Sequence, residues 1–198
     1  MTVLAIIRHG PTAWNEGGRV QGREDIPLSD TGRAEVRRWR VPPEVAGFDW
    51  VTSPLSRAVE TAAILGAAAP PSDHRLVEMN WGTWSGLQLE ALRAELGDLM
   101  KAWEAKGLDF QAPGGESPRD VQNRLRPFLA ERASTGAPTV AVAHKGIIRA
   151  VYALSVGWDM TGPPPHKLRD GCAQVFRLDA RGLPQVERLN IPLVPDEP

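Results

Sequence analysis

Two apolar segments, far apart in the chain, each run directly into a histidine, and this pairing limits the folds that the sequence can adopt. The first, residues 3–7, precedes Arg8 and His9; the second, residues 139–143, precedes His144. Short apolar runs of this kind predict strands inside a parallel sheet. The carboxyl ends of parallel strands meet at one edge of an open α/β sheet, where ligands gather. We therefore expect the two histidines to face one pocket.

Strand and helix patterns alternate along the chain, which predicts a three-layer α/β/α fold with a mostly parallel central sheet. Strand character is found at residues 3–7, 49–52, 139–143, 173–178 and 185–189. The last two flank a turn composition and are expected to form a hairpin. Helices are expected at 29–39 with Ser29 as a cap, after Ser53-Pro54 to about 65, at 87–96, at 117–133 with Ser117 as a cap, and at 146–156. Pro127 should kink or divide the helix at 117–133, and residues 192–198 should form a frayed tail.

The bulk properties exclude several classes of protein. A chain of 198 residues suits one domain with a sizeable core. Its formal net charge of -1 argues against a nucleic-acid or membrane-surface partner, which would favour a basic patch. Cys172 is the only cysteine and lies in an apolar run, so it is expected to be buried and inert. Neither a signal peptide nor an apolar membrane span is visible, which predicts a cytoplasmic protein.

Several blocks of the sequence together resemble the histidine phosphatase superfamily, also called the phosphoglycerate mutase-like family. The resemblance runs almost end to end. The blocks are Arg8-His9-Gly10-Pro11-Thr12 with Asn15, Gln21-Gly22, Pro27-Leu28-Ser29 with Gly32, Ser53-Pro54-Leu55-Ser56-Arg57-Ala58 with Glu60-Thr61-Ala62, Glu78 before Gly82 and Gly86, Gly115-Glu116-Ser117, and Ala143-His144. The resemblance implies a phosphoglycerate mutase-like fold with a single domain over residues 1–198. It also implies that a small helical insertion at about 79–116 caps the site.

The chemistry that the resemblance implies is the hydrolysis of a phosphate monoester, a dianion that reacts very slowly without help. His9 is the expected nucleophile and forms a phosphohistidine, with one ring nitrogen held by a backbone carbonyl and the other facing phosphorus. Gly10 is expected to leave room for the phosphate. Arg8 and Arg57 are expected to bind the phosphate oxygens through their guanidinium groups, and His144 completes the positive clamp.

The remaining roles rest on the resemblance more than on the residues themselves. Glu78 is expected to protonate the leaving alkoxide and then to activate water. Asn15, Gln21 and Gly22 are expected to contribute substrate contacts, whereas Glu116 is better explained as a loop brace. No metal ion or other cofactor is implied, because arginine and histidine supply the positive charge.

Lys145 departs from the family pattern, in which the position after the second histidine is more often a small residue. If its ammonium enters the pocket, the small phosphorylated substrate should carry a second acidic group. The alternative is a solvent-facing lysine at the start of a helix. Trp14, Trp81 and Trp84 are either residues at the pocket mouth or ordinary core aromatics. His166 is a further candidate for substrate contact, and the sequence does not select one substrate or one oligomeric state.

The same core of residues serves phosphatases, which transfer the phosphoryl group to water, and mutases, which return it to another hydroxyl of the substrate. Only 65 residues lie between Glu78 and His144, which is short for a mutase cap. A shorter cap excludes water less well, so the sequence favours a phosphoric monoester hydrolase over a phosphoglycerate-mutase-type phosphotransferase. A non-catalytic phospholigand-binding module and a vestigial interaction scaffold are the alternatives outside enzymes. Retention of both a nucleophile and an acid argues against them.

Overall fold

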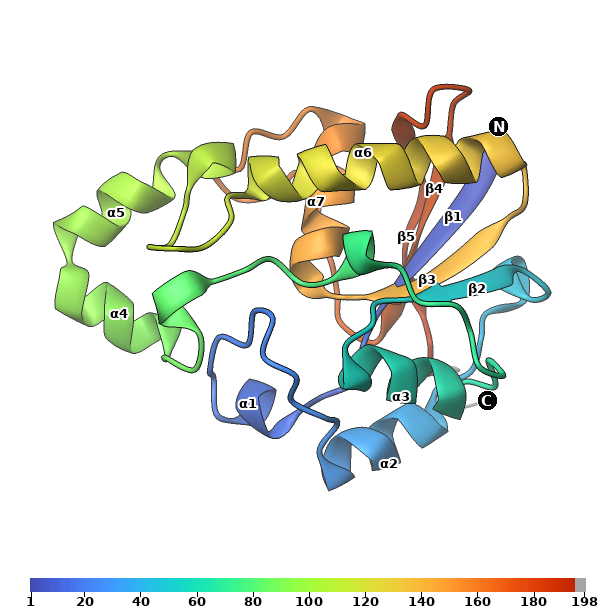
Figure 1. Ribbon diagram of the computed structural model, residues 1–198, viewed down its shortest axis with the longest axis horizontal. Coiled ribbons are helices and arrows are strands. Elements are labelled where there is room, and N and C mark those ends of the chain that lie inside the picture. Colours follow the sequence, from blue (N-terminus) through green and yellow to red (C-terminus); the bar gives the residue numbers. More distant parts are fainter. Residues whose placement is uncertain (195–198) are drawn as a thin grey trace.

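The computed structural model describes residues 1–194, which form a five-stranded sheet between two layers of helices (Figure 1). The strand order is β2-β3-β1-β4-β5. Neighbours β2, β3 and β1 are parallel, β4 is antiparallel to β1, and β5 is antiparallel to β4. The strands are β1 (Thr2–Arg8), β2 (Asp49–Thr52), β3 (Thr139–Ala143), β4 (Cys172–Leu178) and β5 (Pro184–Pro192). The expected α/β class, its mostly parallel direction and the terminal hairpin are confirmed.

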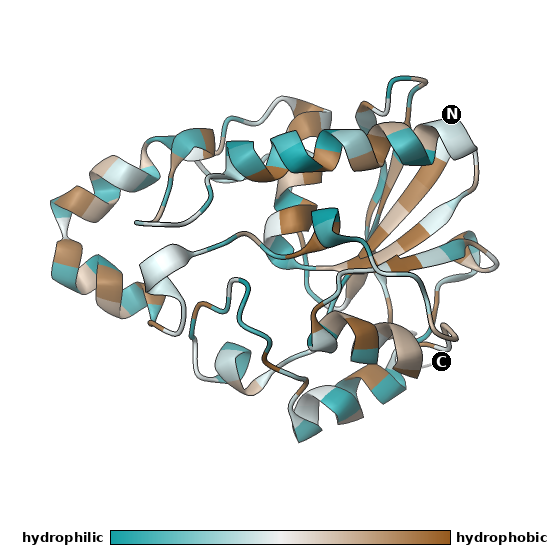
Figure 2. Ribbon diagram, in the orientation of Figure 1, coloured by the Kyte–Doolittle hydropathy of each residue, from teal (hydrophilic) through white to brown (hydrophobic). Residues whose placement is uncertain are grey.

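The central strands are apolar because both of their faces are covered. All five residues of β3 are buried. In β1 the side chains alternate: Leu4 and Ile6 pack with one core cluster, whereas Ala5 and Ile7 pack with another. The strands are accordingly coloured mainly as hydrophobic in Figure 2. Two-sided burial of this kind fixes the register of the sheet and therefore fixes where each strand ends.

Two helices cover each face of the sheet. On one face lie α6 (Pro118–Thr135) and α7 (Lys145–Val156); on the other lie α2 (Asp30–Arg38) and α3 (Ser56–Ile64). Ser29 caps α2, and Ser117 caps α6 in a reciprocal capping box with Asp120, as expected from the sequence. Of the two effects expected of Pro127, division of the helix does not occur, because α6 continues through it, and a kink stays a prediction. Asn123 and Pro127 are both exposed, so water can solvate the carbonyl that proline leaves without a donor.

The segment of residues 79–116 extends away from the sheet and contains its own small core (Figure 1). It comprises the short helix η3 (Gly82–Trp84), α4 (Leu89–Leu96), α5 (Asp98–Glu104) and the short helix η4 (Gly107–Asp109). Trp84, Leu92, Met100 and Ala112 are buried together there. The sequence predicted α4 but not α5, nor the one-turn helix α1 (Ala13–Glu16).

Two short helices and the C-terminal end of β5 complete the description of residues 1–194. Two short helices, η1 (Pro43–Val45) and η2 (His74–Leu76), lie in the connections around β2 and α3. Pro192 belongs to β5 rather than to a tail, and residues 195–198 lie outside the described part of the chain. Within residues 1–194, no helix combines the length and the apolar composition that crossing a bilayer requires.

Candidate active site

Three neighbouring parallel strands end at the same edge of the sheet, and a polar side chain follows each of them. His9 follows β1, Ser53 follows β2 and His144 follows β3. The backbone N–H of His9 donates to the carbonyl of Ala143 at 3.0 Å, and that of Ser53 donates to Val142 at 2.9 Å. The sheet therefore fixes the origin of each side chain. The two imidazole rings lie 5.1 Å apart between centroids, so the structure brings both predicted histidines together.

The ring of His9 is oriented by its own neighbour. Its Nδ1 lies 2.6 Å from the carbonyl oxygen of Gly10, which can only accept, so Nδ1 carries the proton and Nε2 is left with a lone pair. Burial, followed by the charges of Arg8 and Arg57, holds the pKa of His9 well below its ordinary value. The ring is consequently neutral near pH 7, which is the form required of a nucleophile.

The proton of His144 is positioned by a serine that the sequence did not single out. Ser53 Oγ accepts from the N–H of Leu55 at 3.3 Å and lies 2.7 Å from Nε2 of His144. The serine hydroxyl can therefore donate to Nε2, which leaves the proton of the neutral ring on Nδ1. Burial and the charge of His9, then those of Arg57 and Arg8, hold the pKa of His144 well below its ordinary value. The expected protonated form is thus not required, because a neutral ring already offers an N–H donor at Nδ1.

Arg57 is fully buried and is held by backbone oxygens. Its Nη1 donates to the carbonyl of Glu24 at 2.7 Å, and its Nη2 donates to that of Gly22 at 2.9 Å. Arg8 is held by an ion pair between its Nη1 and the carboxylate of Asp170 at 2.7 Å. Backbone carbonyls do not neutralise the charge of Arg57, and Arg8 is paired with only one, exposed carboxylate. The buried region around the two histidines therefore keeps a positive charge.

Partnerless polar atoms gather on the predicted residues. Within residues 1–194, seven buried side-chain nitrogen or oxygen atoms have no hydrogen-bond partner, and four of them belong to predicted site residues. They are Arg8 Nε, Arg57 Nε, His144 Nδ1 and Gln21 Oε1. Buried polar groups without partners are uncommon and call for an explanation. Three of the four are N–H donors, which is the complement that a phosphate dianion requires.

Glu78 lies beside this group, at the first turn of α7. Its Oε2 accepts from the N–H of Gly146 at 3.2 Å, and its Oε1 accepts from the N–H of Met79 at 2.8 Å. The charge of Glu78 also opposes the effect of burial on the pKa of Arg57. A Cβ atom at Gly146 would stand 2.3 Å from Glu78 Oε1, so this close approach requires glycine. No pattern in the sequence singled out Gly146.

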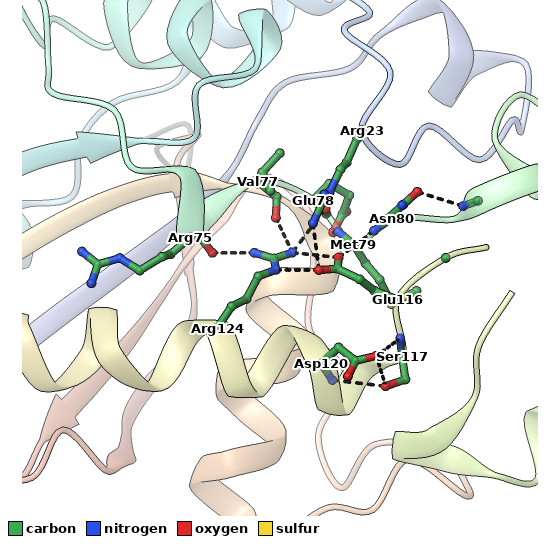
Figure 3. Close-up of polar contacts among 12 residues, drawn as sticks. Arg23, Arg75, Val77, Glu78, Met79, Asn80, Glu116, Ser117, Asp120 and Arg124 are labelled. Atoms are coloured by element: carbon green, nitrogen blue, oxygen red, sulfur yellow. Dashed lines mark hydrogen bonds and ion pairs between the residues drawn. The ribbon is translucent and has the colours of Figure 1, made fainter. Parts of the chain in front are cut away.

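The loop that carries Glu78 is held by a second arginine, Arg124 of α6 (Figure 3). Its Nη1 donates to the carbonyl of Arg75 at 2.5 Å, and its Nη2 donates to the carbonyls of Val77 at 2.7 Å and Glu78 at 3.3 Å. One guanidinium therefore provides the hydrogen-bond donors for three carbonyls within four residues of this loop backbone. Sequence reasoning missed Arg124, since an arginine on a helix is usually a solvated side chain.

Glu116 joins this arrangement and is the loop brace that the sequence predicted (Figure 3). Its Oε2 accepts from the N–H of Asn80 at 2.9 Å, and its Oε1 pairs with Arg124 Nε at 3.1 Å. Arg23 reaches the same Oε1 from the N-terminal loop, at 2.8 Å. The brace thus connects the Glu78 loop, helix α6 and the loop that follows α1.

Asn15, Gln21 and Gly22, the other residues expected to contact substrate, differ in their surroundings. The side-chain oxygen of Asn15 accepts from the N–H and the hydroxyl of Thr12, so that end of the amide serves as a helix cap. Gln21 is buried. Gly22 has a φ of +55°, and a Cβ atom there would lie 3.2 Å from the backbone nitrogen of Trp81. Glycine at 22 is therefore explained by backbone conformation and by close packing against the 79–116 segment.

The structure gives Gly10, Trp84 and His166 structural roles in the fold. A Cβ atom on Gly10 would come within 2.3 Å of a methyl group of Val36, so packing against α2 already requires this glycine, and room for the phosphate stays a prediction. Trp84 is a core residue of the 79–116 segment, flanked by Trp81 and Trp103. Nδ1 of His166 is hydrogen-bonded to the hydroxyl of Tyr152 at 2.9 Å.

Neither the single thiol nor the metal-ligating side chains of residues 1–194 form a second reactive site. Cys172 is buried, and this burial raises the pKa of its thiol, which fits the expected inert residue. Residues 1–194 contain no cluster of three or more histidine, cysteine or acidic side chains arranged to hold a metal ion.

A model of the histidine phosphatase superfamily (branch 1) matches residues 4–192. The chain belongs to this superfamily. It is 32% identical over 192 residues to a 2,3-bisphosphoglycerate-dependent phosphoglycerate mutase of Methylobacterium radiotolerans, covering 90% of each chain. It is 37% identical over 169 residues to a glucosyl-3-phosphoglycerate phosphatase of Mycobacterium tuberculosis, covering 76% of this chain and 73% of that protein. The structure of a mycobacterial glucosyl-3-phosphoglycerate phosphatase in complex with VO3 is similar with a TM-score of 0.78 and 27% identity, covering 98% and 100% of the two chains.

Proposed function

We propose that this member of the superfamily is a phosphoric monoester hydrolase that acts on a small phosphorylated metabolite through a phosphohistidine at His9. One observation carries the proposal. A neutral His9, whose Nδ1 is committed to the Gly10 carbonyl, lies next to the partnerless N–H groups of Arg8, Arg57 and His144. Donors of this kind complement the oxygens of a phosphate, and Nε2 supplies the electron pair that attacks phosphorus.

The proposed reaction has two steps. In the first, a bond forms between His9 Nε2 and phosphorus, the ester P–O bond breaks, and Glu78 gives its proton to the departing alkoxide. In the second, Glu78 takes a proton from water, the oxygen of which attacks phosphorus while the P–N bond breaks. Arg8, Arg57 and His144 stabilise the charge of the equatorial oxygens in both steps. In this proposal Arg8 and Arg57 supply the positive charge that a metal ion would otherwise provide, and His144 adds a neutral N–H donor.

The site is proposed to be closed by the 79–116 segment, within one domain that spans the chain. Arg23 and Glu116 support this role, since their ion pair connects the segment's end to the loop containing Gln21 and Gly22. We further propose that the protein works in the cytoplasm, in keeping with a single buried thiol.

The decisive experiment follows a phosphate label. Incubation with a 32P-labelled aryl phosphate and denaturation in alkali should give a protein-bound label that is lost in acid and maps to His9. His9→Ala should fold normally and lose turnover by at least about a thousandfold, because no other group supplies the attacking electron pair. His74→Ala, which removes an exposed histidine on η2, should retain activity. A folded and active His9→Ala protein, or a label on serine, would refute the mechanism.

Phosphoryl transfer between hydroxyls is the second candidate, favoured by the relatives that are named phosphoglycerate mutases. The same label separates the two: a phosphatase releases it as inorganic phosphate, whereas a mutase returns it to an isomer of the substrate. We expect inorganic phosphate, since the short 79–116 segment favours access of water to the phosphoenzyme. A chelator should leave the release of phosphate unchanged.

A further inference from the structure

A cavity of about 180 Å³ is lined by Arg8 and by the residue after His144, and Arg8 and His144 are two members of the proposed phosphate site. It lies between the carboxyl end of β1, the first turns of α7 and the loop that leads into β4. We name this cavity the basic pocket. Its charged lining residues are Arg8, Lys145, Arg149, Lys167, Arg169 and Asp170. Five of these six side chains are cationic, and they include two of the four lysines of the whole chain.

Four of the five cations of the basic pocket lack counter-ions within the described part of the chain. Among residues 1–194, neither Lys145, Arg149, Lys167 nor Arg169 makes an ion pair, although most arginines elsewhere in that range do. Arg149 is half-buried and stacks on the ring of Trp158, 4.8 Å from its centroid. Burial without a carboxylate lowers its pKa, which reports an unfavourable environment for the charge. An anion in the pocket would stabilise the buried charge of Arg149.

The single acid of the pocket is already engaged. The carboxylate of Asp170 accepts from Nη1 of Arg8 at 2.7 Å, which leaves the buried Nε of Arg8 without a partner. Arg8 therefore belongs to both places: one edge faces the acid in the pocket wall, and Nε is among the partnerless donors next to His9. Lys145 likewise links them, because it directly follows His144 in the chain and lines the pocket. The basic pocket and the proposed phosphate site are therefore immediate neighbours.

We propose that the basic pocket binds a second anionic group of the substrate, a carboxylate or a second phosphate, while the ester phosphate lies at His9. This inference rests on the proposed function, and it assigns substrate selection to Lys145, Lys167 and Arg149. It gives Lys145 the pocket-facing role that the sequence left open. The geometry selects a substrate with two anionic groups over one with a single phosphate and a neutral remainder.

Two matched pairs of compounds test the proposal. 3-Phosphoglycerate and glycerol 3-phosphate differ by a carboxylate, and fructose 1,6-bisphosphate and fructose 6-phosphate differ by a second phosphate at longer range. The measured quantity is the ratio of kcat/KM for the member with two anionic groups over the member with one, within each pair. In the double variant Lys145→Met/Lys167→Met this ratio should fall by about tenfold or more for at least one pair, mainly through KM. Both lysines are exposed, so the substitutions should not disturb the core.

Lys106→Met is the matched control, because it removes one exposed lysine from the 79–116 segment, and its ratios should equal those of the parent. Equal ratios in the double variant and the parent would overturn the proposal. So would an equal loss on all four compounds. If chloride or sulfate changes activity in the parent but not in the double variant, while the ratios stay constant, the pocket holds a separate anion and the substrate role is wrong.

Failure of the proposed function would look different. If none of the four compounds nor an aryl phosphate is hydrolysed, the same pairs are compared by calorimetric binding. A preference for 3-phosphoglycerate over glycerol 3-phosphate, or for the bisphosphate over fructose 6-phosphate, that disappears in the double variant would sustain the basic pocket in a non-catalytic protein. Absence of any such preference would reject it.

Discussion

The nitrogen that His144 presents to a phosphate depends on a serine 91 positions earlier in the chain. Among residues 1–194, Nε2 of His144 is the only acceptor within hydrogen-bond reach of the Ser53 hydroxyl, so the serine proton is directed toward that nitrogen. Without that donor, a neutral imidazole could take the other tautomer and turn a lone pair toward the phosphate oxygens. A single hydroxyl therefore decides whether His144 attracts or repels the anion.

Ser53→Ala should lower kcat/KM for phosphate monoesters by about 10- to 100-fold, the effect of losing one well-placed hydrogen bond to a charged ligand. The proposed role is positioning, so the test includes a direct readout. 15N NMR of the His144 ring should show a protonated Nδ1 in the parent and a mixture of tautomers in Ser53→Ala. A parent protein with the proton on Nε2 would contradict this assignment whatever the kinetics are.

At the scale of elements, helix α6 holds the loop that carries Glu78. Arg124 donates to loop carbonyls that lie 46 to 49 positions earlier in the chain and pairs with Glu116 (Figure 3). The proposed general acid is thus located by a helix to which its carboxylate makes no hydrogen bond or ion pair among residues 1–194. Residues that hold a reacting group in place affect the rate through geometry, even without touching substrate.

Arg124→Gln should slow hydrolysis of alkyl phosphates by about 10- to 100-fold, since it removes several charge-assisted hydrogen bonds and displaces Glu78. An activated aryl phosphate should be affected much less, because its leaving group departs without a proton. Arg126→Gln, an exposed neighbour on the same helix, should behave as the parent. Equal losses on both substrates would show that Arg124 stabilises the fold without positioning the acid.

Elements were predictable from the sequence where the cause is local. Strands β2 and β3 have the expected bounds, and the caps at Ser29 and Ser117 are correct, because apolar runs and capping residues act within a few positions. The contribution of Ser53, Gly146 and Arg124 was not predictable in this way. Each acts on a group 46 to 91 positions away, so its reason appears only once the sheet has brought the strand ends together.

The whole molecule buries two histidines in neutral form, and this couples its stability to pH. His9 and His144 have lowered pKa values in the folded state because of burial and neighbouring cations. In the unfolded chain they titrate near their ordinary value of about 6.5. Below that pH the unfolded state binds more protons than the folded state, so the free energy of unfolding falls as the pH falls. The same burial that prepares a nucleophile therefore carries a cost in acid.

Between about pH 7.5 and about pH 5.5 the free energy of unfolding should decrease by up to about 1.4 kcal/mol for each of the two histidines. This window isolates them, because the carboxyl groups with lowered pKa values, such as Asp73 and Asp120, have ordinary values of 3.8 and lose their stabilising effect only at lower pH. Urea unfolding at the two pH values measures the change. In the double variant His9→Gln/His144→Gln the change should largely disappear, whereas His74→Gln should retain it. A parent whose stability is constant across the window would mean that at least one ring is protonated in the folded protein, and the proposal of a neutral nucleophile beside a neutral donor would fail.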